Sequence, residues 1–448
     1  MRARLAVRAW LAATSIIGPA NAEDEPPPAP PVDAAPAEAE LARQAMAIAE
    51  LRAALEQEKH AREHPRLELS GYAQVDWTLH QQLSQDEIDH SSGLPLNQNR
   101  FTLRRGHLRV DARQGFVSGS LEIDVNTNSG PQVRPIDAEV SVRWEKGEGD
   151  HVAFTLGLMK IPFGFEVPEL DWARPFLERS TMMRALFPGE FDLGARIAGR
   201  YGPLEGAVAV MNGSPLGDKG FPALAPVASK DVIGRIGVRA DILSGVHVEA
   251  GASMETGTGF HEGTPTTKDQ LVWRDENGDG LVQATEVHLI AGASATPSQT
   301  FDRFAVGGDA RLIIAIPWLG DLAIRAEIAR GKNLDRGVEV ADPVSAGRDL
   351  RELGWYLGAT QELTEWALVG ARYDRYDPDQ DANEQRALNL VPIDRTYGTL
   401  ALLAMLRYQK ARLALEYDRN TNALGRAASG APVTRKDDAL TVRGQVVF

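Results

Sequence analysis

The feature that most constrains this chain is an alternation of apolar and polar residues with period two, which begins near residue 66 and recurs to the C-terminus. Such a pattern predicts strands with one apolar face and one polar face. An even number of such strands allows an antiparallel sheet to close on itself. Sixteen segments show the pattern: 67–80, 99–112, 115–125, 134–146, 151–161, 191–201, 203–212, 231–243, 245–256, 302–316, 320–331, 351–362, 364–375, 397–409, 411–420 and 438–448.

The connections between these segments alternate strictly between short and long. The short ones hold a few residues, such as Arg113-Gln114 and Leu319-Gly320. A membrane barrel with tight periplasmic turns and long external loops produces this alternation, whereas a soluble sandwich has no reason to separate its loops in this way. We therefore predict a 16-stranded antiparallel transmembrane β-barrel over residues 65–448. Its long external loops are 81–98, 126–133, 162–190, 213–230, 257–301, 332–350, 376–396 and 421–437.

Both ends of the chain indicate export to the outer membrane of a Gram-negative bacterium. Residues 1–22 combine a positive start, a short apolar run and the small-residue pattern Ala20-Asn21-Ala22, which is typical of a secretory signal peptide. The last segment ends on Phe448, and a terminal Phe after an alternating strand resembles the C-terminal signature of bacterial outer-membrane proteins. Outer-membrane lipid is then the expected surrounding of the barrel.

Between the signal and the barrel the composition changes twice. Residues 23–36 are rich in Pro and Ala and predict an extended linker. Residues 37–64 are rich in helix formers, and Leu41, Ile48 and Leu55 recur at intervals of seven. We predict a periplasmic helix there. It is either a weak coiled coil that helps to hold protomers together or a single solvated amphipathic helix.

Composition excludes several classes of function. The chain of 448 residues carries 48 Lys and Arg against 62 Asp and Glu, a net charge of −14, which argues against binding to nucleic acid. It has no cysteine, so disulfides and thiolate chemistry are excluded. The nine histidines show no complete metal-ligand spacing, and no hydrolase or phosphate-binding motif is present. We therefore expect neither an enzyme nor a cofactor for transport.

Several motifs resemble those of the phosphate-selective porin O and P family. The double arginine in Phe101-Thr102-Leu103-Arg104-Arg105 resembles its early strand, and Lys160-Ile161-Pro162-Phe163-Gly164-Phe165-Glu166 resembles its K-x-P-F-G-x-E motif. The pair Glu178-Arg179 and the segment around Arg196 resemble its downstream motifs. This resemblance implies a homotrimeric porin for small anionic solutes, in which 162–190 folds inward as the constriction loop.

Strand parity places both arginines and carboxylates in the lumen, so the lumen carries charges of both signs. Charges of both signs set up a transverse field near a constriction, although most of them are expected to pair across neighbouring strands. The alternatives are a substrate-specific channel for another solute and a non-transporting adhesin or structural barrel. The candidate pore residues are Arg105, Arg109, Lys160, Arg179, Arg196 and Arg200.

The longest external loop contains a twelve-residue segment, Asp275 to Glu286, with the pattern of an EF-hand calcium loop. In that pattern Gly280 makes the sharp turn at the sixth position and Val282 fills the apolar eighth. The alternative is a solvated acidic turn. We predict that calcium orders this loop without a catalytic role. Its ligands would be Asp275, Asn277, Asp279, the Leu281 carbonyl, Gln283 and Glu286.

Overall fold

The computed structural model describes residues 43–53, 56, 65–82, 84–88, 95–128, 130–147, 149–216, 228–386, 388–423, 425–426 and 432–448. The predicted signal peptide (1–22) and linker (23–36) lie outside these residues. The chain divides into two units, Met1–His60 and Ala61–Phe448.

In the first unit, residues 43–53 form a helix, as the composition predicts. Met46, Ile48 and Leu51 on this helix are exposed. Leu41 and Leu55, the neighbouring positions of the predicted heptad, lie outside the described residues. Association of these helices between protomers therefore stays a prediction. Within the described residues, no helix is long and apolar enough to cross a membrane.

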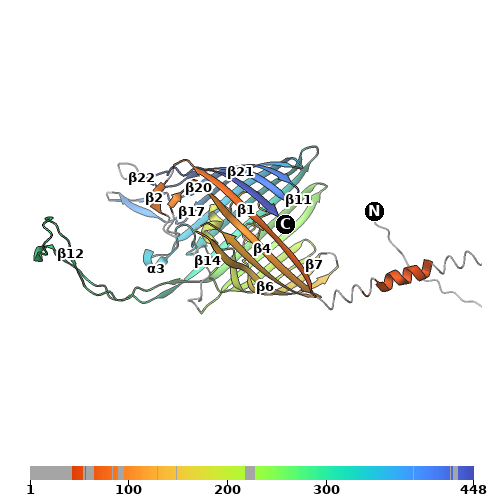
Figure 1. Ribbon diagram of the computed structural model, residues 1–448, viewed down its shortest axis with the longest axis horizontal. Coiled ribbons are helices and arrows are strands. Elements are labelled where there is room, and N and C mark those ends of the chain that lie inside the picture. The colour runs from red at the N-terminus through yellow and green to blue at the C-terminus, as the bar shows by residue number, and fades with distance from the viewer. Residues whose placement is uncertain are drawn as a thin grey trace, which may run out of the picture. The chain divides into compact units, whose positions relative to one another are not determined.

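In the second unit, sixteen of the described strands form one closed antiparallel barrel, in which each strand pairs with its neighbours along the chain (Figure 1). The last strand closes the sheet by pairing with the first, from Tyr72 opposite Val447 to His80 opposite Ala439. The predicted fold is confirmed. The barrel strands are β1 (Arg66–His80), β4 (Arg100–Gln114), β5 (Val117–Asn126), β6 (Gln132–Lys146), β7 (Asp150–Lys160), β8 (Phe191–Tyr201), β9 (Leu204–Met211), β10 (Asp231–Leu243), β11 (Val246–His261), β14 (Gln299–Ile316), β15 (Gly320–Lys332), β16 (Arg351–Thr364), β17 (Ala367–Asp377), β20 (Tyr397–Tyr408), β21 (Ala411–Thr421) and β24 (Ala439–Val447).

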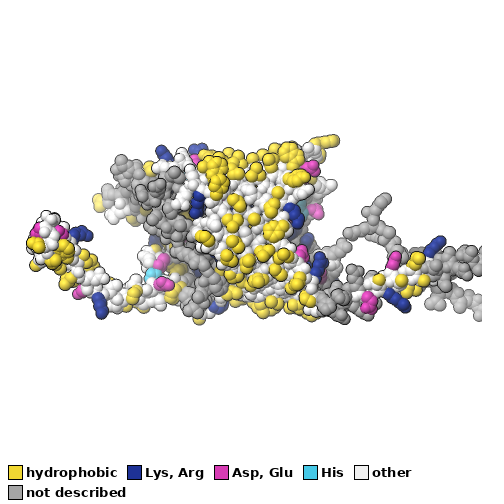
Figure 2. Space-filling view, viewed as in Figure 1, with side chains coloured by type: hydrophobic (Ala, Val, Ile, Leu, Met, Phe, Trp, Pro, Cys, Tyr) yellow, Lys and Arg dark blue, Asp and Glu magenta, His cyan; other side chains and the backbone are white. Residues whose placement is uncertain are grey.

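The two faces of the barrel differ as the period-two pattern predicts. In β16, Glu352 and Tyr356 point inward and are buried, whereas Trp355 and Leu357 point outward and are exposed. Apolar side chains cover much of the outer wall (Figure 2). A barrel with apolar residues outside and charged residues inside suits a lipid surrounding, because lipid solvates the apolar face and the polar face lines the lumen.

The external loops differ from the prediction in two ways. Because β11 and β14 continue beyond the predicted segments, the longest loop is 262–298 and not 257–301. Four of the loops also carry a short two-stranded hairpin, which a period-two count cannot detect in strands this short. The hairpins are β2 (Ser84–Ile88) with β3 (Pro95–Asn97), β12 (Gln270–Trp273) with β13 (Val287–Ile290), β18 (Asn383–Arg386) with β19 (Asn389–Pro392), and β22 (Gly425–Arg426) with β23 (Pro432–Val433).

The main hydrophobic core lies inside the barrel, between the wall and the segment that follows β7. Phe163, Met182 and Phe187 from this segment pack against wall residues such as Ala305 and Tyr356, and all five are buried. The segment from 161 to 190 is therefore a packed part of the lumen, as expected for an inward-folded constriction loop.

Candidate pore constriction

The constriction loop (161–190) is fixed by side chains from opposite sides of the barrel. Gly164 N donates a hydrogen bond to Ser253 Oγ on β11 at 3.0 Å, and Glu166 N donates to Glu327 Oε1 on β15 at 2.7 Å. Leu177 N donates to Glu416 Oε2 on β21 at 3.0 Å. Buried backbone N–H groups need acceptors, and these wall side chains supply them. The loop is thereby anchored at several points.

A short helix, α2 (Thr181–Leu186), forms the second half of the loop. Ser180 caps its N-terminus by accepting a hydrogen bond from Met183 N. Glu166 in turn accepts hydrogen bonds from both the backbone N and the hydroxyl of Ser180, at 2.9 and 2.7 Å. Met182 and Leu186 are fully buried. The loop is thus rigid because its helix is capped and packed on the wall.

The double arginine of the resemblance motif lies at a bulge in β4. Two consecutive strand residues normally face opposite sides, but the pairing with β1 shifts register at Gln74 and Val75. As a result both arginines reach Glu178 of the loop. Arg104 Nε donates to Glu178 Oε1 at 2.8 Å, and Arg105 Nη2 donates to Oε2 at 3.1 Å.

A third cation completes this cluster. Arg443 on β24 donates to Glu178 Oε1 at 2.8 Å and also pairs with Asp76 on β1 at 2.7 Å. Burial alone would raise the pKa of the Glu178 carboxyl, but the guanidinium groups of Arg104 and Arg105 hold it well below its usual value. Glu178 stays ionised and ties the loop to β1, β4 and β24. Sequence parity placed Arg105 in the lumen and missed Arg104, since a bulge leaves no sign in the alternation.

Two predicted pore residues, Lys160 and Arg179, pair with the same carboxylate. Lys160 Nζ lies 3.0 Å from Glu190 Oε2, and Arg179 Nε lies 3.0 Å from Glu190 Oε1. Arg179 also donates to the carbonyls of Met183, Phe187 and Pro188 at the end of α2. Arg179 is buried, and burial lowers its pKa. This placement makes Arg179 part of the support of the loop.

The other predicted pore residues lie on the wall. Arg109 on β4 pairs with Asp111, Glu122 and Asp137 at 2.7 to 3.1 Å. Arg196 on β8 donates to the Lys160 carbonyl at 3.1 Å and lies 3.5 Å from Glu139. Arg200, near the periplasmic end of β8, donates to the Gly202 carbonyl. The structure thus brings Lys160 and Arg196 together beside the loop, while Arg109 lies in a separate ion-pair group.

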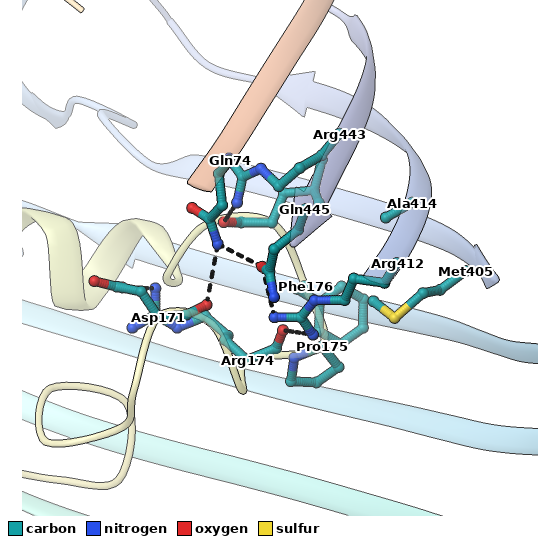
Figure 3. A pocket seen from close by; sticks show the side chains of 11 residues that line it. Gln74, Asp171, Arg174, Pro175, Phe176, Met405, Arg412, Ala414, Arg443 and Gln445 are labelled. Atoms are coloured by element: carbon teal, nitrogen blue, oxygen red, sulfur yellow. Dashed lines mark hydrogen bonds and ion pairs between the residues drawn. The ribbon is translucent and has the colours of Figure 1, made fainter. Parts of the chain in front are cut away.

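Beneath the loop, a small pocket lies between residues 171–177 and the strands β1, β20, β21 and β24 (Figure 3). Arg412 points into it and donates to the Arg174 carbonyl and the Gln445 amide oxygen at 3.2 and 2.8 Å. Gln74 joins Gln445 to the carbonyl of Asp171. The side chains of Gln74, Arg412 and Gln445 occupy much of the pocket, and their hydrogen bonds hold the loop to the wall at a further point.

A second external loop also folds onto the constriction. Arg336 N and Gly337 N both donate to the Ala185 carbonyl in α2 at 3.0 Å, and Leu334 is fully buried. Asp335 accepts hydrogen bonds from Gly337 N and from the hydroxyl of Tyr376. The sequence placed these residues in an external loop, and nothing in the pattern indicated that they enter the barrel mouth.

The EF-hand-like segment forms a compact turn between β12 and β13. The carboxylate of Asp275 accepts hydrogen bonds from the backbone N of Gly278 and Gly280 at 2.7 and 2.8 Å, and Gly280 has a φ of 72°. Glu286 is buried and accepts hydrogen bonds from Trp273 Nε1 and Glu276 N. Among the described residues, no group of three or more His, Cys, Asp and Glu side chains is gathered closely enough to hold a metal ion.

Comparison with known proteins adds the fold class. No protein-family model matches the chain, and no curated protein matches it. The outer membrane channel DcaP of Acinetobacter baumannii is similar in structure, with a TM-score of 0.54 and 12% identity over 86% of this chain and 98% of that one. An anion-selective porin from Comamonas acidovorans gives 0.49 and 11% identity over 86% of this chain and all (100%) of that one. At these identities the likeness concerns the fold: this chain has the barrel architecture of outer-membrane porins.

Proposed function

We propose that this protein is an outer-membrane porin through which small hydrophilic solutes diffuse passively, with a preference for anions such as phosphate. The observation that carries the proposal is the closed barrel whose lumen holds an anchored loop. The loop is hydrogen-bonded to β11 at Gly164 and to β21 at Leu177. Such a loop narrows the lumen but leaves it a passage through which solutes diffuse without an energy source. The motif resemblance to the phosphate-selective family supports the preference for anions.

Partly exposed arginines of the barrel wall support the same preference. The side chains of Arg109, Arg196 and Arg311 are 28%, 21% and 25% exposed, so a solute in the lumen reaches them. External charge is screened beyond a Debye length of about 8 Å, so the charges at the neck outweigh the net charge of the whole chain. Carboxylates lie beside these arginines, so the ion selectivity depends on where each charge lies in the lumen and not on the sum of the charges.

Reversal potentials in a planar bilayer under a salt gradient test this proposal. We expect the purified protein to form open channels in KCl with anion preference. Replacing Lys160 and Arg196 by Gln should move the reversal potential toward cation preference. A cation-selective wild type, or an unchanged reversal potential in the double variant, would refute the anion preference.

The same measurement separates the alternatives. A substrate-specific channel for another solute would conduct KCl but would show no effect of added phosphate. A non-transporting adhesin or structural barrel would give no channels and would bind a soluble partner through its external loops. No conductance from correctly folded protein would therefore overturn the porin proposal itself.

The proposed setting is a homotrimer in the outer membrane of a Gram-negative bacterium, exported by the signal peptide 1–22. The exposed Ile48 and Leu51, three residues apart and therefore on one face of the helix, support association of the periplasmic helices, because an apolar helical face gains stability by burial against a second copy. Cross-linking of the intact protein, compared with a variant carrying Ile48→Glu and Leu51→Glu, tests whether these helices contribute to the trimer.

Calcium binding by 275–286 is a second proposal, and the turn at Gly280 and the burial of Glu286 support it. Asp275, Asn277, Asp279, Gln283, Glu286 and the Leu281 carbonyl are oxygen donors of the kind that calcium prefers, and binding requires the carboxylates among them to come closer together than they lie in the structure. A single unpaired loop predicts a dissociation constant of about 10⁻⁴–10⁻³ M. Calcium should slow proteolysis within 262–298, and Asp275→Ala with Glu286→Ala should abolish the protection. Equal cleavage in calcium and in chelator would rule the site out.

A further inference from the structure

One side chain of the constriction loop, that of Phe165, lies close to two arginines of the wall. The ring of Phe165 lies 5.5 Å from the guanidinium carbon of Arg311 and 5.5 Å from that of Arg325. Arg311 on β14 and Arg325 on β15 are direct partners in the strand pairing. Two like charges directly opposite each other repel, and the face of an aromatic ring partly offsets that repulsion.

The two arginines differ in how completely they are paired. Arg325 donates to Glu169 Oε1 of the loop at 2.6 Å. For Arg311 the nearest carboxylate oxygen, Glu249 Oε2, is 3.6 Å away, which is beyond ordinary hydrogen-bond length. The Nε of each arginine is buried without a hydrogen-bond partner among the described residues, so the two arginines differ only in their terminal nitrogens. The Arg311 side chain is 25% exposed, and its terminal N–H groups remain as donors for an anion in the lumen.

The loop near this arginine also carries partly exposed apolar side chains. Phe165, beside Arg311, is half-buried, and Leu170, which follows the Glu169 that binds Arg325, is 49% exposed. Exposed apolar area costs about 25 cal/mol per Å², which a ligand recovers when it covers that area. Phosphate would satisfy the donors of Arg311 but has no apolar surface with which to cover these side chains.

We propose that the constriction is a binding site for aromatic carboxylates, with the carboxylate on Arg311 and the ring against Phe165 and Leu170. This inference rests on the proposed porin function and names its solute class. A flat guanidinium accepts a carboxylate along its edge and a ring on its face, so one residue serves both parts of such a solute. Acetate, with the same charge, obtains only the first contact, and a saturated ring covers apolar area but does not stack flat on the guanidinium.

The test is interruption of the KCl current through single channels by benzoate, cyclohexanecarboxylate, acetate and phosphate. Benzoate should block at a concentration about tenfold lower than acetate does, because it covers apolar area that acetate leaves in water. Cyclohexanecarboxylate should fall between them. Equal blocking concentrations for benzoate and acetate would overturn the proposal.

Variants locate the site. Arg311→Gln should raise the blocking concentration of benzoate about tenfold, since a hydrogen bond to a charged group is lost. Arg311→Lys keeps the charge without the flat group and should give a smaller rise. Phe165→Leu should remove the advantage of benzoate over cyclohexanecarboxylate. The KCl conductance of each variant reports whether its barrel has folded.

A matched control is Arg407→Gln. Arg407 on β20 is also a half-exposed lumen arginine, and it pairs with Glu362 at 2.7 Å without a ring beside it. It should leave benzoate block unchanged, and an equal effect of Arg407→Gln and Arg311→Gln would refute the site. Absence of any KCl current in the wild type would instead refute the porin proposal, so the two failures are distinguishable.

Discussion

Two groups of arginines in the lumen, those that bind the constriction loop and those that do not, differ in exposure and in partners. Where the constriction loop meets the wall, Arg372 and Arg443 are only 5% exposed, and each binds both a wall carboxylate and the loop. At wall positions whose side chains do not bind the loop, here called the free wall, the Arg109 and Arg239 side chains are 28% and 40% exposed and pair with carboxylates of neighbouring strands. The first group holds the loop, and the second group is open to the lumen. Lumenal charge thus has two separate roles in one barrel.

The largest expected effect comes from breaking the anchored side. Arg443→Met leaves Asp76 and Glu178 without their shared cation, and removal of one partner of a buried pair costs about 3–5 kcal/mol. We expect a lower midpoint of thermal unfolding in detergent and a larger single-channel conductance, because the loop loses an anchor. Arg239→Met on the free wall is the control and should cost at most about 1 kcal/mol. Equal losses in the two variants would contradict the division of roles.

A charge-neutralising pair on each side sharpens the comparison. Arg109→Gln with Arg196→Gln should shift the reversal potential toward cations while the unfolding midpoint changes little, since both residues are partly exposed on the free wall. Lys160→Gln with Arg179→Gln should mainly lower the unfolding midpoint, because Glu190 loses its two nearest cations and keeps only Arg174, at 3.7 Å. If both pairs moved the reversal potential equally, the loop supports would also be solute contacts.

Acid should weaken the attachment of the constriction loop. Burial would raise the pKa of the Asp171 carboxyl, but Arg105 and Arg174 hold it well below its usual value, as Arg104 and Arg105 do for Glu178. A carboxyl whose pKa is depressed in the folded state stabilises that state above its unfolded pKa, which is about 3.9 for Asp and 4.3 for Glu. This stability is lost as pH falls below those values. We expect proteolysis of the loop or a rise in conductance below about pH 4.

The variant Glu178→Gln makes this acid effect testable. It removes one of the loop carboxyls whose pKa is depressed, so the conductance should be higher at neutral pH and should change less on acidification. This is the smallest of the expected differences, since Asp171 continues to titrate in the variant. A pH profile identical to that of the wild type would show that Glu178 does not govern the anchoring.

The barrel was predictable from the sequence because alternation determines which face a residue occupies. Every predicted strand is present, and the bounds differ by a few residues at most sites and by up to five at the end of β11. The role of each inward residue was not predictable, because parity says nothing about contacts across the lumen. Arg179 lies in a motif and supports a helix end, whereas Arg311 lies in no motif and retains free donors. The bulge that turns Arg104 inward also leaves no trace in the pattern.

The last barrel strand, β24, supplies both Arg443 and Gln445 to the loop and closes the sheet against β1. Before β24 joins the sheet, the loop carbonyls of Leu177 and Trp172 lack these two hydrogen-bond donors. The seating of the constriction therefore reports completion of the whole wall, since its final contacts cannot form around an open sheet. We therefore expect the bore of the barrel to be set only once β24 has paired with β1, because the loop lacks the contacts with Arg443 and Gln445 until then.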